Sequence, residues 1–81
     1  MKRPVATPTV TPGTYQHYKG AHYWVIGVGV LHDTTWEFVA YTSSKAADEG
    51  RVLFRSLSDF LAPVEWPDGV TRPRFVREGW A

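Results

Sequence analysis

Residues 22–31, HYWVIGVGVL, constrain the fold of this chain more than any other part of the sequence. The segment is apolar almost throughout, and it is too short for a helix that crosses a bilayer. Because side chains of a strand point alternately to its two faces, we predict a long strand with one face formed by His22, Trp24, Ile26, Val28 and Val30. The opposite face then holds Tyr23, Val25, Gly27, Gly29 and Leu31. The two glycines leave a trough that favours a sharp bend of the strand and also suits the floor of a pocket.

Shorter segments on both sides of this strand alternate in the same way. Residues 15–19 precede it, and residues 36–43 follow a polar turn, which indicates a hairpin. Residues 51–56 predict a further strand, and Ser58 is placed to cap a short helical turn near residues 58–61. Short strands without a long helix predict an all-β fold. At this length, the best fit is a small SH3-like, partly open five-stranded antiparallel barrel.

The predicted domain covers residues 14–76, and the segments on either side differ from it in composition. Residues 1–13 are rich in proline and threonine, and proline lacks an amide donor, so we predict an extended arm. A proline-recognition ligand is the alternative to a solvated lead-in. Residues 77–81 form a C-terminal tail. The start of the chain lacks the apolar stretch of a signal peptide, so we expect a cytoplasmic protein without a membrane segment.

The composition limits how such a domain is stabilised. A chain of 81 residues forms one small domain, and 15% of its residues are aromatic. Each aromatic ring buries about 150–250 Å², which helps a core of this size. The absence of cysteine excludes a disulfide framework and a thiolate metal site. The formal net charge of +1 argues against strong nonspecific binding of nucleic acid.

A set of spaced residues connects this chain with a known family. The opening pattern consists of Gly13, Tyr15, His17, Tyr18, Lys19, Gly20, Tyr23, Val25 and Gly27. Later matches are His32, Thr35, Glu37, Val39, Tyr41, Arg55, Leu57, Phe60, Pro73, Arg74 and Phe75. With this pattern, which contains HYKG, the chain resembles the bacterial and phage family called domain of unknown function 1653 over about residues 13–76. The resemblance implies an SH3-like barrel and no particular activity.

The chain also departs from this family at several positions. Asp33 and Thr34 stand where the family tends to carry Ser and Glu. Leu53 and Ser56 stand where it tends to carry Trp and Pro. A ligand site that included these positions would be altered here.

Our candidate ligand site combines polar and aromatic side chains of three predicted strands: Tyr15, His17, Lys19, Glu37, Tyr41 and Arg55. Arginine offers a planar fork of donors for a carboxylate or phosphate, and lysine offers a point charge. We therefore predict a non-enzymatic binding or adaptor module, without cofactor or metal, that holds a protein segment or a small anionic ligand on an aromatic-rich face. The structural alternative is a cross-strand ion pair between Glu37 and Arg55, with His17 bonded to a buried carbonyl.

The alternative function is that of a nucleic-acid-associated accessory protein. It would use Arg72, Arg74 and Arg77, which alternate with Phe75 and Trp80, because single-stranded sites combine basic groups with stacking rings. Packing of both rings onto the domain is the competing structural explanation.

Two further hypotheses follow from the remaining residues, and a metal site is not predicted. A small enzyme would pair His17 with Glu37 as general acid and base. Exposed rings would also suit self-association into a homo-oligomer. A metal site would need three or four convergent ligands, which the separated His17, His22 and His32 do not offer.

Overall fold

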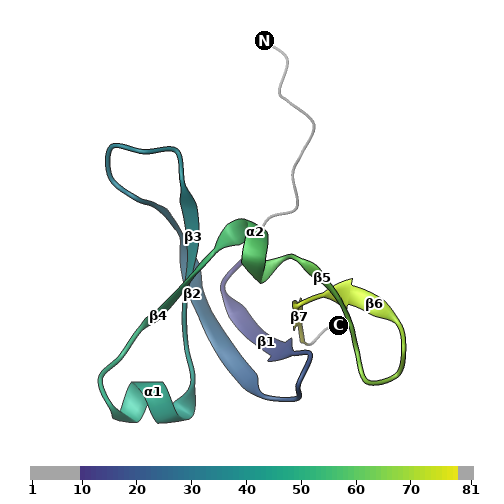
Figure 1. Ribbon diagram of the computed structural model, residues 1–81. Coiled ribbons are helices and arrows are strands. Elements are labelled where there is room, and N and C mark those ends of the chain that lie inside the picture. Colours follow the sequence, from purple (N-terminus) through teal and green to yellow (C-terminus); the bar gives the residue numbers. More distant parts are fainter. Residues whose placement is uncertain (1–9, 79–81) are drawn as a thin grey trace.

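The computed structural model describes residues 10–78 (Figure 1). Its strands are β1 (Gly13–His17), β2 (His22–Val30), β3 (Glu37–Thr42), β4 (Leu53–Ser56), β5 (Pro63–Glu65), β6 (Thr71–Pro73) and β7 (Phe75–Arg77). Its helices are α1 (Ser44–Asp48) and α2 (Leu57–Phe60). Neither of these helices is long and apolar enough to cross a membrane. Residues 1–9, most of the predicted arm, and residues 79–81, with Trp80 of the predicted tail, lie outside the described residues.

Five antiparallel strands form the main sheet in the order β4-β3-β2-β1-β7, and β5 pairs with β6 in a separate two-stranded sheet. The prediction of an all-β fold with a five-stranded antiparallel sheet is confirmed. The sheet does not close into a barrel, so β4 and β7 stand at its two edges. β4 has four residues and β7 has three. Edge strands this short offer few backbone groups for the β4–β7 pairing that would close a barrel.

A β-bulge in β2 changes which residues share a face of the sheet. Val25 lies opposite Tyr41, whereas Val28 lies opposite Val39, because the register shifts around Ile26. Residues that lie directly opposite each other point to the same side of a sheet. Val28 therefore shares the inner face with Val25, and the predicted assignment of faces is wrong beyond Val25. The extra residue of the bulge is the physical reason.

The same bulge places both glycines of β2 on the outer face. Gly27 lies opposite Ala40, and Gly29 lies opposite Phe38. A Cβ atom added at either glycine would meet nothing within 4 Å. The predicted trough is therefore open to the surface, and it remains available to a binding partner.

Aromatic rings make up most of the core beneath the inner face. The buried cluster consists of Val10, Tyr15, Val25, Val39, Tyr41, Phe60 and Phe75. The rings of Phe60 and Phe75 stack with centroids 4.1 Å apart, and Tyr41 meets both of them edge-on. Val10, predicted to lie in the extended arm, is part of this core. Many of the rings near β2 therefore stabilise the fold.

Helix α2 carries Phe60 into the core, and the predicted helical turn is confirmed. It begins one residue earlier than predicted, at Leu57, and its N-cap is Ser56 in place of Ser58. The Ser56 Oγ accepts a hydrogen bond of 3.2 Å from the Asp59 amide. Because β4 continues directly into α2, the helix holds Asp59 close to the end of the strand (Figure 1).

Candidate functional site

Arg55 lies on the inner face of β4, opposite Val39 of β3. Its Nε donates a 3.2 Å hydrogen bond to the Tyr41 hydroxyl, and its Nη1 donates a 2.6 Å hydrogen bond to Asp59 Oδ2. The guanidinium carbon lies 5.4 Å from the centroid of the Phe75 ring. The hydrogen bond to Tyr41, with a smaller contribution from Asp59, raises the pKa of Arg55 above its ordinary value. Arg55 is thus a positioned cation at the border of the aromatic core.

Asp59 joins Arg55 to a second guanidinium, that of Arg74. The Arg74 Nη2 lies 3.5 Å from Asp59 Oδ1, and the Arg74 Nε donates a 3.1 Å hydrogen bond to the Asp59 carbonyl. The Arg74 guanidinium also lies 5.9 Å from the centroid of the Tyr18 ring. The arginine side chains are 33% and 22% exposed for Arg55 and Arg74, so both remain accessible to solvent. One carboxylate therefore lies between two partly exposed arginines.

His17 lies among aromatic rings at the end of β1. Its ring centroid is 4.6 Å from that of Tyr18 and 4.8 Å from that of Phe75. Burial lowers the pKa of His17, and the positive charges of Arg55, Arg74 and Lys19 lower it further. The ring is therefore neutral at neutral pH.

The hydrogen bonding of His17 fixes the position of its proton. The Nδ1 atom accepts a hydrogen bond of 3.1 Å from the Lys19 amide. In the neutral ring the proton then resides on Nε2, because an imidazole nitrogen that accepts a hydrogen bond cannot also carry a proton. His17 presents Nε2–H as a donor without adding a charge to its surroundings.

We call His17, Lys19, Arg55, Asp59 and Arg74 the cationic cluster. Three of these side chains are positive at neutral pH, one is negative, and the histidine is neutral. Burial is the main cause of the lowered pKa of His17, and the charges of Arg55, Arg74 and Lys19 contribute in the same direction. Such an arrangement favours an additional anion.

The cationic cluster contains three of the six predicted site residues, and Tyr41 adjoins it through Arg55. Tyr41 is only 5% exposed, so it acts through its hydroxyl and offers no open ring face. Tyr15 is equally buried, and its hydroxyl donates to the Thr11 carbonyl at 2.9 Å. Tyr15 therefore belongs to the core in this structure and offers no open ring face to a ligand. Lys19 is exposed, with its Nζ 5.8 Å from the centroid of the Tyr18 ring.

Glu37 does not join the cationic cluster, and the predicted ion pair with Arg55 is not formed. Val39 separates Glu37 from Tyr41 along β3, and Arg55, opposite Val39, bonds towards Tyr41. The Glu37 side chain is exposed and lines a different groove with Leu57. The ionic partner of Arg55 is Asp59.

The hypothetical acid–base pair of His17 and Glu37 is also separated by the sheet. The two residues belong to β1 and β3, which lie on opposite sides of β2. Strands two places apart are about 10 Å from each other, whereas proton transfer needs about 3 Å. The direct contact required by the enzyme hypothesis is not present.

The three arginines of the nucleic-acid hypothesis point to different partners. Arg72 forms a bidentate ion pair with Asp68, with hydrogen bonds of 3.1 and 2.7 Å. Arg77 donates to the Pro12 carbonyl at 3.3 Å, and Arg74 belongs to the cationic cluster. Each of the three arginines is therefore already bonded to an acceptor of this chain. Packing of Phe75 is confirmed, because the ring is only 2% exposed.

The remaining histidines lie outside the cationic cluster. The His22 Nδ1 is 2.8 Å from a carboxylate oxygen of Glu78, and the His32 Nε2 is 3.4 Å from one of Asp33. Across residues 10–78, no three His, Asp or Glu side chains gather in a way that would hold a metal ion.

Sequence reasoning missed the link that Asp59 makes between Arg55 and Arg74. Arg55 lies on β4 and Asp59 on α2, so their contact depends on the direct passage from the strand into the helix. The position of Arg74 had no local signal, since it depends on the pairing of β7 with β1.

Comparisons with known proteins agree with this fold. A family model described as "Protein of unknown function (DUF1653)" matches residues 13–77. A solved structure of a protein belonging to DUF1653 from Bordetella bronchiseptica has a TM-score of 0.69 and 32% sequence identity, covering 89% of this chain and 91% of that one. No curated protein matches the chain. With a family match over most of its length, the chain belongs to the DUF1653 family.

Proposed function

We propose that this protein is a non-enzymatic binding module whose cationic cluster holds the carboxylate or phosphate group of a ligand, either a small molecule or a protein segment. The observation that carries this proposal is the position of Asp59 between Arg55 and Arg74. A carboxylate fits between these guanidinium groups, and one internal carboxylate does not balance the charge of both arginines and Lys19. An external anion would complete that balance.

The arginines have suitable donors for such a ligand. A guanidinium carries five N–H donors in a fixed plane. Within residues 10–78, the Arg55 side chain donates to Tyr41 and Asp59 through Nε and Nη1, which leaves its Nη2 donors for an oxyanion. The rings of Phe75 and Tyr18 lie within 6 Å of the Arg55 and Arg74 guanidinium carbons and help to orient them. Positioned donors bind a carboxylate or phosphate at a smaller entropic cost.

His17 adds a hydrogen-bond donor to the site, and the protonation of its ring responds to a bound anion. In the free protein its ring is neutral, because burial and three cations lower its pKa. A bound anion would offset those cations and raise the pKa of His17. The histidine ring is therefore a built-in reporter of binding.

The test is a titration with inorganic phosphate and, separately, with a short acidic peptide, followed by NMR of the His17 ring and the arginine Nε–H groups. We expect saturable shifts at His17 and Arg55 and their loss in Arg55→Gln. Arg72→Gln is the matched control, because it removes the same charge at an exposed ion pair outside the cluster. Phosphate and peptide distinguish a small ligand from a protein segment. If neither probe shifts His17, the proposal is wrong.

Asp59→Asn tests the same site with the opposite sign. The substitution removes the internal carboxylate that competes with the ligand for Arg55 and Arg74. We expect phosphate affinity to increase by up to about fivefold, the value of one partly exposed ion pair. Asp68→Asn removes the same charge beside Arg72 and should leave the affinity unchanged. If both substitutions raised the phosphate affinity equally, the affinity would depend on the net charge of the protein alone, which would contradict a site at Asp59.

A further inference from the structure

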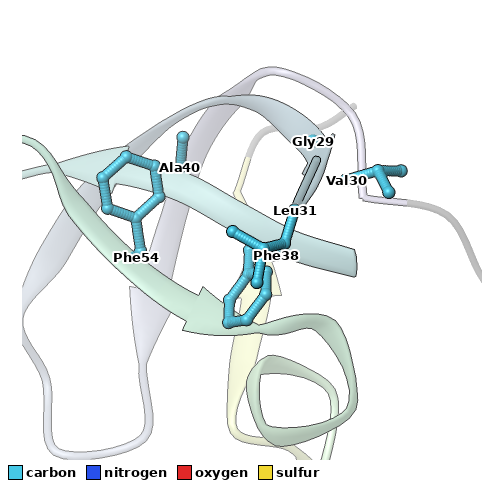
Figure 2. A pocket seen from close by; sticks show the side chains of 6 residues that line it. All are labelled: Gly29, Val30, Leu31, Phe38, Ala40 and Phe54. Atoms are coloured by element: carbon cyan, nitrogen blue, oxygen red, sulfur yellow. The ribbon is translucent and has the colours of Figure 1, made fainter. Parts of the chain in front are cut away.

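The outer face of β2, β3 and β4 is largely apolar, with the polar residues Thr42 and Ser56 at the ends of their strands. An apolar groove with a volume of about 340 Å³ crosses it, lined by Gly29, Val30, Leu31, Phe38, Ala40 and Phe54 (Figure 2). Phe54 is 69% exposed, and Trp24, on the same face opposite Thr42, is 49% exposed. Apolar surface of this kind commonly marks an interaction site. This face lies opposite the core, so it does not overlap the inner face that carries Arg55.

The register of the strands places a protrusion and a depression in one row of this face. Gly27 of β2 lies opposite Ala40 of β3, and Ala40 lies opposite Phe54 of β4. Phe54 projects from one side of the row, while Gly27 leaves open space on the other. Ala40, the residue between them, has a small side chain. A protrusion and a matching depression on one surface are what a two-fold symmetric interface requires.

From this pattern we infer that the outer face binds a second copy of the chain. Two such sheets can pack face to face about 10 Å apart, related by a two-fold axis parallel to β3. The rotation places β4 of each copy over β2 of the other, because both strands lie about 4.8 Å from β3. Phe54 of each copy then lies over Gly27 of its partner, and the two Ala40 side chains face each other at the axis. This self-association extends beyond the proposed function.

The available area agrees with a dimer. A standard interface buries about 800 Å² per partner, and about 65% of a homodimer interface is apolar, so about 500 Å² of apolar surface is needed. The exposed parts of Trp24, Leu31 and Phe54, with smaller parts of Phe38 and Ala40, supply on the order of 400–500 Å². The formal net charge of +1 adds little repulsion between copies.

The test measures the mass of the full chain by analytical ultracentrifugation over a range of concentrations. We expect a concentration-dependent dimer, and we expect Phe54→Glu to weaken it by at least about 30-fold, as for an interface hot spot. Val70→Glu is the matched control, because Val70 is 49% exposed and lies beside β6, away from this face. Circular dichroism would verify that each variant is folded. A wild-type monomer at about 100 µM, well above a micromolar dissociation constant, would overturn the inference and leave the face to a different protein.

A mixing experiment tests the symmetry itself. Gly27→Lys places a charge in the depression without a clash inside its own copy, and this variant alone should be monomeric. Mixed with Phe54→Glu, it should restore a heterodimer that has one native contact and one Glu–Lys contact. If the mixture remains monomeric, the proposed two-fold arrangement is wrong.

Discussion

Replacement of Ser56 by alanine should destabilise the protein, whereas the same change at Ser58 should have little effect. The Ser56 Oγ accepts the Asp59 amide at 3.2 Å at the start of α2, and loss of an N-cap costs about 0.5–2 kcal/mol, typically about 1 kcal/mol. Helix α2 has only four residues, but Phe60 at its end is completely buried. Fraying of the helix therefore disturbs the core, so we expect about 1 kcal/mol.

For a domain of this size, about 1 kcal/mol lowers the melting temperature by roughly 4–8 °C. Thermal and urea unfolding followed by circular dichroism would measure the change. Ser58 is exposed, and an exposed substitution usually stays within about 0.5 kcal/mol, at most half of the effect expected for Ser56→Ala. The reasoning would be refuted if both variants melted together, or if Ser58→Ala were the less stable.

Three further predictions concern the fold around the site. Lowering the pH below about 6.5 should destabilise the protein, because the lowered pKa of His17 makes the unfolded chain the better proton acceptor. Urea unfolding against pH should show this loss of stability in the wild type and not in His17→Phe, with His32→Phe, which replaces an exposed histidine, as the control. Gly13→Ala should cost about 1–3 kcal/mol, because Gly13 has a φ of 145°, which residues other than glycine rarely adopt. Gly29→Ala meets open space and no such φ, and an equal loss of stability in both variants would contradict this explanation. Phe60→Ala removes a fully buried ring at a cost of about 3–5 kcal/mol, which should abolish cooperative melting in circular dichroism, and a transition near that of the wild type would be inconsistent with the described core.

Local patterns in the sequence predicted most of the strands. Alternation and turn residues located β1 to β4 and the helical turn near Phe60, because both signals depend on neighbouring residues. The bulge at Ile26 has no such signal: it arises from the pairing of β2 with β3, so the prediction that Val28 shares a face with Trp24 was wrong.

The site was less predictable than the strands because its geometry depends on distant parts of the chain. His17 and Arg55 were identified from their chemistry, and the fold brings both to the ring of Phe75. Arg74 was assigned to another function, since its place beside Asp59 depends on long-range backbone contacts: the pairing of β7 with β1 and the hydrogen bond from the Arg74 amide to the Ala62 carbonyl. Glu37 was wrongly joined to Arg55 because shared strand alternation does not specify which way a long side chain leans.

The bulge in β2 also limits how this strand can change in length. Gaining or losing one residue between Ile26 and the following turn would exchange the two sides of that half of the strand, and the glycines would then face the hydrophobic interior in place of Val28. A change of two residues would leave each following side chain on its present face of the sheet. Tolerated insertions and deletions in this half of β2 should therefore come in even numbers.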